Sequence, residues 1–134
     1  MTKKKGNAKG AEKLVNSIVA GMQEKKANRI TVIDLRTISN PLADYFVICS
    51  GSSDKQVDAI TESVEKFTHQ QMKEDPWRVE GKSNYEWVIM DYVNVIAHVF
   101  TEKKRDFYRL EELWGDGKIQ VIEDFSPQMN SMNN

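Results

Sequence analysis

Apolar residues recur along the chain at two different spacings, and each spacing predicts one kind of secondary structure. Over residues 11–22, and again over residues 57–67, they fall every three or four positions. This period is typical of an amphipathic helix that packs one face against a core. The second helix is expected to end at Asp75-Pro76, and a third is predicted over residues 107–114, closed by Gly115.

Strands are predicted where β-branched, alternating or continuously apolar segments occur. The predicted strands are Ile30–Arg36, Tyr45–Cys49, Trp77–Gly81, Tyr85–Asp91 and Asn94–Thr101, with residues 118–125 as a further short candidate. The second is apolar throughout, as in a strand buried on both faces. A short connection at residues 92–94 predicts an antiparallel hairpin, and the helical connection between the second and third strands favours a parallel pair. The expected fold class is α/β (α+β), a mixed sheet of about five strands with helices packed on it.

The length of 134 residues allows one ordinary domain. We expect a disordered basic N-terminus at residues 1–9, a single domain at residues 10–124 and a disordered tail at residues 125–134. Residues 1–30 hold eight Lys or Arg against two Asp or Glu, although the whole chain carries a net charge of -1. Such a start either touches nucleic acid without sequence preference or is a solvated terminus.

Composition narrows the class of protein and its compartment. The apolar share of 40% and charged share of 29% are those of a globular protein. No apolar run approaches the roughly 20 residues of a membrane span, and no secretory signal is visible. Cys49 is the only cysteine, so an intrachain disulfide is impossible and a reducing, cytoplasmic location is expected.

Catalytic and metal-binding arrangements are hard to assemble from these residues. The two histidines and single cysteine show no metal-binding spacing. Cys49 and His98 are a conceivable nucleophilic pair, but Cys49 closes an apolar run and is better explained as buried filler. A nucleotidyl transferase would place paired carboxylates on a strand after a Gly-Ser turn, whereas the acids after residues 51–53 lie on the predicted helix. We therefore expect no enzyme activity, no cofactor and no metal.

A binding surface is the remaining candidate. The two-residue period of a strand places Trp87 and Asp91 on one face of the hairpin, together with His98. The next segment adds Arg105 and Tyr108. Trp, Tyr and Arg dominate the energetics of protein interfaces. The alternative is structural: residues 107–114 form the core face of the last helix, and His98 is a satisfied, half-buried histidine.

Several blocks of the chain, taken together, resemble the ribosomal silencing factors, also called Iojap-like proteins. The blocks are "ADYFVICSGSSDKQVDAI" (residues 43–60), Glu80-Gly81, "WVIMD" (87–91), "VIAHVF" (95–100) and "RDFYRLEELW" (105–114). The resemblance covers about residues 11–116, with the blocks in the expected order. One departure is Val93-Asn94 in the hairpin turn, where the family usually has Gly-Asp. Valine is poor at positive φ, so a different local turn is expected.

The resemblance implies a fold related to nucleotidyl transferases, without their catalytic carboxylates, and a mechanism of steric exclusion. Such proteins bind the large ribosomal subunit through its ribosomal protein fourteen and prevent joining of the small subunit, which represses translation. On this basis the expected contact residues are Trp87, Asp91, His98, Arg105, Tyr108 and Glu111. A weak contact of the N-terminal lysines with ribosomal RNA and a homodimer through the same surface are further expectations. The alternatives are a general RNA-binding module and a nucleotidyltransferase-like enzyme.

Overall fold

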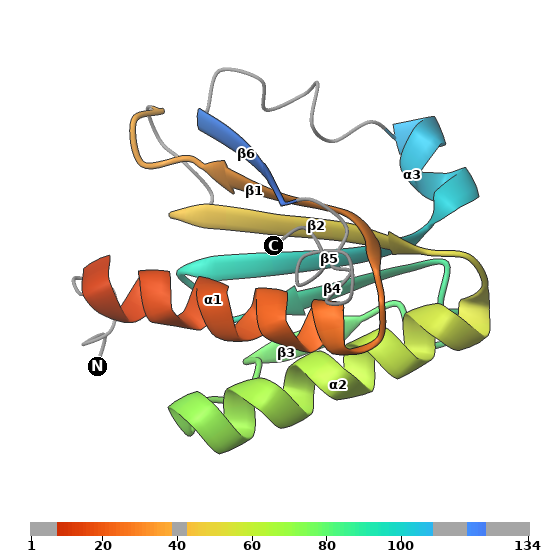
Figure 1. The fold of residues 1–134 in the computed structure, drawn as a ribbon, viewed down its shortest axis with the longest axis horizontal. Helices are drawn as coiled ribbons and strands as arrows, with labels where there is room; N and C mark the ends of the chain where they lie inside the picture. The colour runs from red at the N-terminus through yellow and green to blue at the C-terminus, as the bar shows by residue number, and fades with distance from the viewer. Residues whose placement is uncertain (1–7, 39–42, 109–117, 123–134) are drawn as a thin grey trace, which may run out of the picture.

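The computed structural model describes residues 8–38, 43–108 and 118–122, which form one mixed sheet with helices packed on it (Figure 1). The helices are α1 (Ala8–Glu24), α2 (Asp54–Met72) and α3 (Glu102–Tyr108), and the strands are β1 (Asn28–Asp34), β2 (Tyr45–Gly51), β3 (Arg78–Glu80), β4 (Trp87–Asp91), β5 (Val95–Thr101) and β6 (Lys118–Ile122). None of these helices is long and apolar enough to cross a membrane. The predicted fold class is confirmed, with six strands where about five were expected.

The sheet has the strand order β3-β4-β5-β2-β1-β6. Only the central pair of β2 and β5 is parallel; the other neighbours are antiparallel, including the predicted hairpin of β4 and β5. The expected parallel pairing of the second and third strands is wrong, because β2 pairs with β5 instead of β3. The burial of these strands explains the difference: β5 is apolar enough to lie in the centre, whereas β3 carries the exposed Arg78 and Glu80 and lies at an edge.

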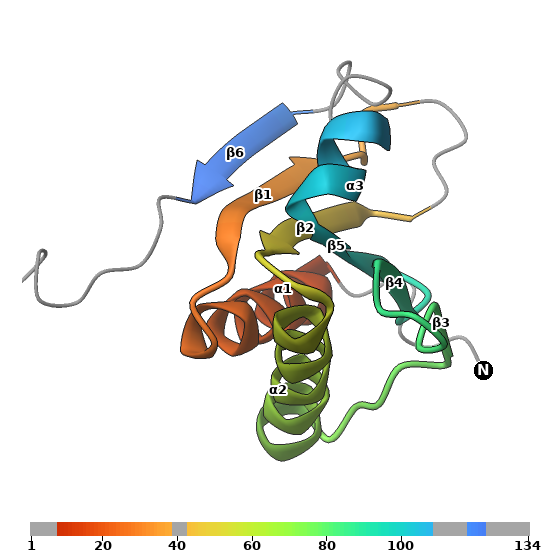
Figure 2. The ribbon, with the colours of Figure 1, turned by 90° about the vertical axis from the view of Figure 1, so that its right-hand side faces the viewer.

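Helices α1 and α2 lie side by side on one face of the sheet (Figure 2). Their apolar stripes meet alternate residues of the strands, and together they form the larger of two hydrophobic clusters. Helix α2 begins after Ser53, whose hydroxyl accepts a hydrogen bond from the backbone N–H of Gln56 at 3.2 Å. It ends at Met72, before the predicted Asp75-Pro76 stop, because Lys73 adopts a left-handed conformation that closes its last turn.

The ends of the chain are only partly described. Helix α1 begins at Ala8, inside the segment of residues 1–9 that was predicted to be disordered. The predicted tail at residues 125–134 and the later part of the predicted helix at residues 107–114 lie outside the described residues.

The turn between β4 and β5 has an unusual backbone. Val93 has a φ of 78°, and the N–H of Asn94 donates to the carbonyl of Tyr92 at 3.0 Å. A positive φ combined with a three-residue hydrogen bond is typical of the rarer, strained form of γ-turn. The carbonyl of Asn94 accepts from the N–H groups of Asp44 and Tyr45, so the turn is fastened to the start of β2. The expected reason for a different turn, that valine avoids positive φ, is wrong, because Val93 adopts that conformation here.

Candidate partner-binding face

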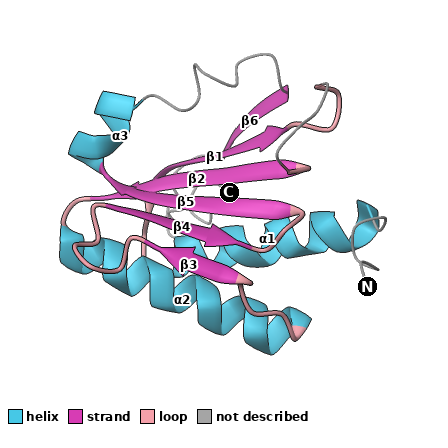
Figure 3. Cartoon of the chain, turned by 180° about the vertical axis from the view of Figure 1, so that it is seen from behind, coloured by secondary structure: helices cyan, strands magenta, loops and turns pink. Residues whose placement is uncertain are grey.

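Figure 3 shows the face of the sheet that is turned away from α1 and α2. This face carries a group of aromatic and aliphatic side chains. The strand register brings them into rows: His98 lies between Ile89 and Ile48, and Phe100 lies opposite Trp87. We call this group the aromatic face, and define it as Phe46, Ile48, Trp87, Ile89, Ile96, His98 and Phe100. Trp87, Ile89 and Ile96 are half-buried, and the other members are buried.

Trp87 and His98 are the two predicted contact residues that the structure brings together. The indole Nε1–H of Trp87 donates to Nδ1 of His98 at 3.1 Å. The Trp87 ring also stacks on Phe100, with 4.9 Å between the ring centroids, and Phe46 meets His98 edge-on at 4.8 Å. These contacts, with geometries that aromatic rings favour, hold the two side chains in fixed orientations on neighbouring strands.

His98 is buried and electrically neutral. Only 6% of the residue is exposed, and burial lowers its pKa to about 4, since a charged ring would lose its hydration. Its Nε2 atom is shielded from solvent and has no hydrogen-bond partner among the described residues. The expectation of a satisfied histidine therefore holds for Nδ1 and fails for Nε2.

Asp91 lies at the far end of β4 from Trp87 and is engaged within the chain. Its carboxylate accepts a hydrogen bond from the backbone N–H of Val93 at 2.8 Å, and its carbonyl accepts from the N–H of Trp77 at 2.7 Å. Asp91 thus stabilises the strained γ-turn that follows β4. In the structure it therefore positions the hairpin tip, in addition to any contact it makes with a partner.

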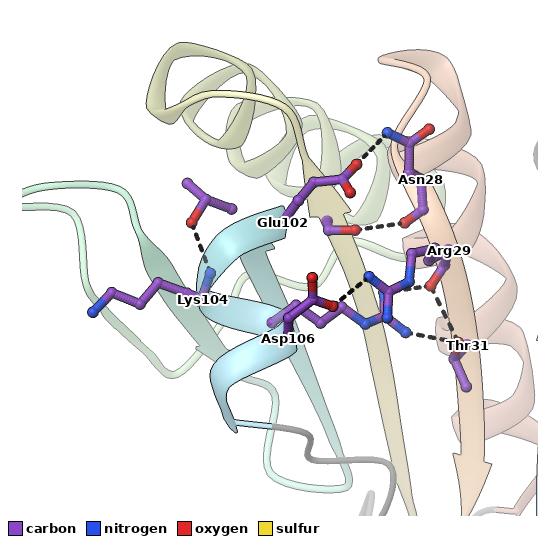
Figure 4. Close-up of polar contacts among 9 residues, drawn as sticks. Asn28, Arg29, Thr31, Glu102, Lys104 and Asp106 are labelled. Carbon is purple, nitrogen blue, oxygen red and sulfur yellow. Dashed lines mark hydrogen bonds and ion pairs between the residues drawn. The ribbon is translucent and has the colours of Figure 1, made fainter.

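Arg105 is 2% exposed and belongs to a network that fastens α3 to β1. Figure 4 shows other members of this network, with Arg29, Thr31 and Asp106 labelled. Its guanidinium donates to the carbonyl of Arg29 and, at 3.0 Å, to Oγ1 of Thr31. Two further bonds join the same elements, from Asn28 to Glu102 at 2.8 Å and from Arg29 to Asp106 at 3.0 Å. Helix α3 is short, so these side-chain contacts, more than its own backbone bonds, determine where it lies.

Thr31 lies in the same cross-strand row as Ile48 and His98. Arg105 is therefore on the same face of the sheet as the aromatic face, two strands away from His98. Tyr108 is the last residue of α3, and its side chain lies outside the description; Glu111 lies outside the described residues altogether. The structure thus brings Trp87 and His98 into contact, places Asp91 at the end of the same face opposite Ile96, and places Arg105 two strands away from His98.

The structure shows where the residues considered for catalysis and metal binding lie. Cys49 pairs with Val99 and belongs to the cluster under α1 and α2, whereas His98 faces the other side of the sheet, so the two cannot act as a nucleophilic pair. Burial also raises the pKa of Cys49 to about 12. The acids after Gly51 lie on α2, as expected. The described residues contain no group of three or more His, Cys, Asp or Glu side chains that could hold a metal ion.

Phe46 and Ile48 are members of the aromatic face that sequence reasoning missed. Their strand was predicted to be buried on both faces, but nothing in the sequence said that β2 lies beside β5. The continuous apolar run of residues 45–49 was the available signal, because such a strand must have side chains to cover on each face.

Comparisons with known proteins agree on one family. A family model described as "Ribosomal silencing factor during starvation" matches residues 8–134. The chain is 37% identical over 112 residues to a protein of Halalkalibacterium halodurans named ribosomal silencing factor RsfS, a match that covers 84% of this chain and 94% of that protein. It is 30% identical over 107 residues to a mouse protein named mitochondrial assembly of ribosomal large subunit protein 1, covering 78% of this chain and 46% of that protein.

A solved structure agrees with the fold. A crystal structure of a Bacillus halodurans protein superimposes with a TM-score of 0.68 and 33% sequence identity, covering 84% of this chain and 98% of that one. The arrangement of the described elements is therefore also found in an experimentally determined structure.

Proposed function

The chain belongs to the family of ribosomal silencing factors, and from this premise we propose that it represses translation by binding the large ribosomal subunit and keeping the small subunit away. We propose ribosomal protein fourteen as the direct partner, contacted on the surface that meets the small subunit. Membership of the family and the names of the relatives support a ribosome-associated role. The partner protein and the steric mechanism are our proposals.

The aromatic face is the observation that carries the proposal. Trp87, Ile89 and Ile96 are half-buried on a sheet face that neither α1 nor α2 covers. Apolar and aromatic side chains gathered in this way are typical of protein interaction sites. Trp87 is held by His98 and Phe100, so little conformational freedom is lost when a partner packs on it.

Steric exclusion requires only that the protein occupy the contact surface tightly. It involves no chemical step, which agrees with the proposal that the chain is a regulatory factor and not an enzyme. We further propose a cytoplasmic location, a weak and salt-sensitive contact of the N-terminal lysines with ribosomal RNA, and a homodimer that uses the same face and therefore competes with the ribosome.

The test is to add the purified protein to isolated large subunits, sediment them through a cushion, and then add small subunits to score joining. We expect the wild type to sediment with large subunits and to block joining. Trp87→Ala is expected to do neither. Because this variant loses packing on Phe100, Ile89→Glu is tested beside it, and thermal unfolding verifies that each variant is folded.

Trp77 provides a matched control, since it is 69% exposed and precedes the edge strand β3, away from the aromatic face. Trp77→Ala is expected to sediment and to block joining like the wild type. A folded wild type that leaves subunit joining unchanged would contradict the proposed function. Equal losses for Trp77→Ala and Trp87→Ala would contradict the assignment of the aromatic face.

A further inference from the structure

The His98 ring has one nitrogen in use and one without a partner. Nδ1 accepts the hydrogen bond from Trp87, so it carries no proton. In the neutral ring the proton must then be on Nε2, which makes Nε2–H a donor. This donor is shielded from solvent and unpaired among the described residues. Buried donors in folded proteins are nearly always paired, so an unpaired one calls for an explanation.

We propose that Nε2–H of His98 is a recognition group that donates a hydrogen bond to a neutral oxygen of the bound partner, either a main-chain carbonyl or a side-chain amide. The inference rests on the proposed function and specifies the chemistry of the same face. The free protein carries the cost of an unpaired donor, and binding removes it. A partner that places an acceptor at Nε2 of His98 therefore gains binding free energy that a partner without this acceptor does not gain.

The surroundings of His98 favour a neutral acceptor over a carboxylate. The ring is flanked by Phe46, Phe100 and the Trp87 indole, with Ile89 as its cross-strand neighbour. A carboxylate brought into such an apolar site would lose its hydration, and a neutral His98 offers it only one hydrogen bond in return. A carbonyl or amide oxygen loses much less hydration free energy, and a hydrogen bond from a single N–H donor is enough to compensate for that loss.

His98 lies close enough to the surface of the aromatic face for a bound partner to reach it. Its neighbours Ile89 and Ile96 are half-buried, so the ring lies beneath the rim of the face and not in the deep core. Because Nε2 is shielded in the free protein, the acceptor reaches it only when the atoms that cover it move. Side-chain rearrangement at an interface is common even where the backbone stays still.

Two substitutions separate the nitrogens of the ring. In His98→Asn the amide oxygen replaces the Nδ1 acceptor and the Nε2 donor is lost. In His98→Gln the longer side chain places an amide N–H near the position of Nε2, while the Nδ1 acceptor is lost. We expect His98→Gln to bind large subunits within about threefold of the wild type, and His98→Asn to bind at least about tenfold more weakly.

A role for His98 that consists only of holding Trp87 predicts the opposite order, with Asn binding better than Gln. That order, or equal affinity of the two variants, would overturn the inference. A variant that is unfolded at the assay temperature is replaced by His98→Phe, which fills the same space without a donor, and wild-type affinity of His98→Phe would also overturn it. If the wild type itself does not bind large subunits, it is the proposed function that fails, so the two failures are distinguishable.

Discussion

Trp87 donates to His98 across the β4–β5 pair at 3.1 Å, and this one bond fixes the state of both ring nitrogens of the histidine. Trp87 lies on the row next to His98, diagonally across the two strands. Because the indole can only donate, Nδ1 must accept, and the proton of the neutral ring must be on Nε2. The tautomer of His98 is thus determined by its hydrogen bond with Trp87, without any charged group.

The first prediction concerns this tautomer. In ¹⁵N-labelled protein at pH 7, the His98 imidazole is expected to give the nitrogen shifts of a neutral ring protonated on Nε2. Trp87→Phe removes the donor to Nδ1, so the tautomers are expected to mix. His69, which is exposed and contacts Asp75, is the internal reference and is unaffected by this substitution. A wild-type ring protonated on Nδ1 would contradict the assignment.

The second prediction is the dependence of stability on pH. The pKa of His98 is about 4 in the folded protein and about 6.5 in an unfolded chain. Between these values the unfolded state binds a proton that the folded state does not, so stability falls as pH falls. The contribution is fully present above about pH 6.5 and is lost towards pH 4, amounting to at most about 3 kcal/mol.

Carboxylates titrate in the same range, and a variant isolates the histidine. Urea unfolding is measured between pH 7 and pH 4.5 for the wild type and for His98→Asn, which keeps every carboxylate. The wild type is expected to lose about 2 to 3 kcal/mol more than the variant over this interval. Parallel curves would show that His98 is solvated in the folded protein.

The periodicity of the sequence was enough to predict the elements and the hairpin face, but not the neighbours of β2. Trp87, Ile96 and His98 share a face because alternation along β4 and β5 follows directly from strand geometry. The parallel pairing of β2 with β5 depends on which of three later strands is apolar enough for the centre of the sheet. This pairing can be predicted only by comparing the apolar character of whole strands, and the periodicity within a single strand does not contain that information.

Side-chain roles were harder to predict than strand faces. Arg105 was expected at the partner contact because arginine is common in interfaces, and the structure shows in addition that it is buried against Thr31. Asp91 was expected to meet the partner, and its carboxylate also accepts a hydrogen bond from the N–H of Val93. Arg105 contacts residues that are distant in the sequence, and Asp91 contacts the turn that follows its own strand. Such contacts depend on the folded structure and cannot be predicted from a local sequence pattern. The contact roles of all six predicted residues remain predictions.

The third prediction concerns Val93, which is 45% exposed and has a φ of 78°. A β-branched residue in this region costs about 1 to 2 kcal/mol, whereas glycine adopts it without strain. Val93→Gly is therefore expected to raise the free energy of unfolding by about 1 kcal/mol, after the greater flexibility of glycine in the unfolded chain is subtracted.

Val121 is the control for this substitution. It is also exposed, but it lies in β6 without a positive φ. Val121→Gly is expected to lower the free energy of unfolding by about 0.5 to 1 kcal/mol in the same urea titration. Destabilisation of similar size by both substitutions would mean that the hairpin turn is not strained.

The fourth prediction concerns the attachment of α3 to β1. Arg105→Lys keeps the positive charge but replaces the planar guanidinium, whose two terminal nitrogens donate to the Arg29 carbonyl and to Thr31, with a single nitrogen on a shorter side chain. We expect a loss of about 1 to 2 kcal/mol in the free energy of unfolding, because buried hydrogen bonds to a charged group are weakened, although the Thr31 hydroxyl still donates to the Arg29 carbonyl at 3.1 Å. Arg78→Lys, in an exposed pair with Glu80, is the control and is expected to change stability by less than about 0.5 kcal/mol.

A double-mutant cycle with Thr31→Val tests whether the loss arises at this contact. If Arg105 acts through Thr31, the two substitutions together cost less than the sum of each alone, by about 1 kcal/mol. Additive losses would place the effect elsewhere in the network. The same variants also test how Arg105 contributes to ribosome binding. If Arg105 only positions α3, Thr31→Val is expected to weaken sedimentation with large subunits in proportion to its loss in the free energy of unfolding. A direct contact by Arg105 instead predicts that Arg105→Lys weakens binding while Thr31→Val leaves it unchanged.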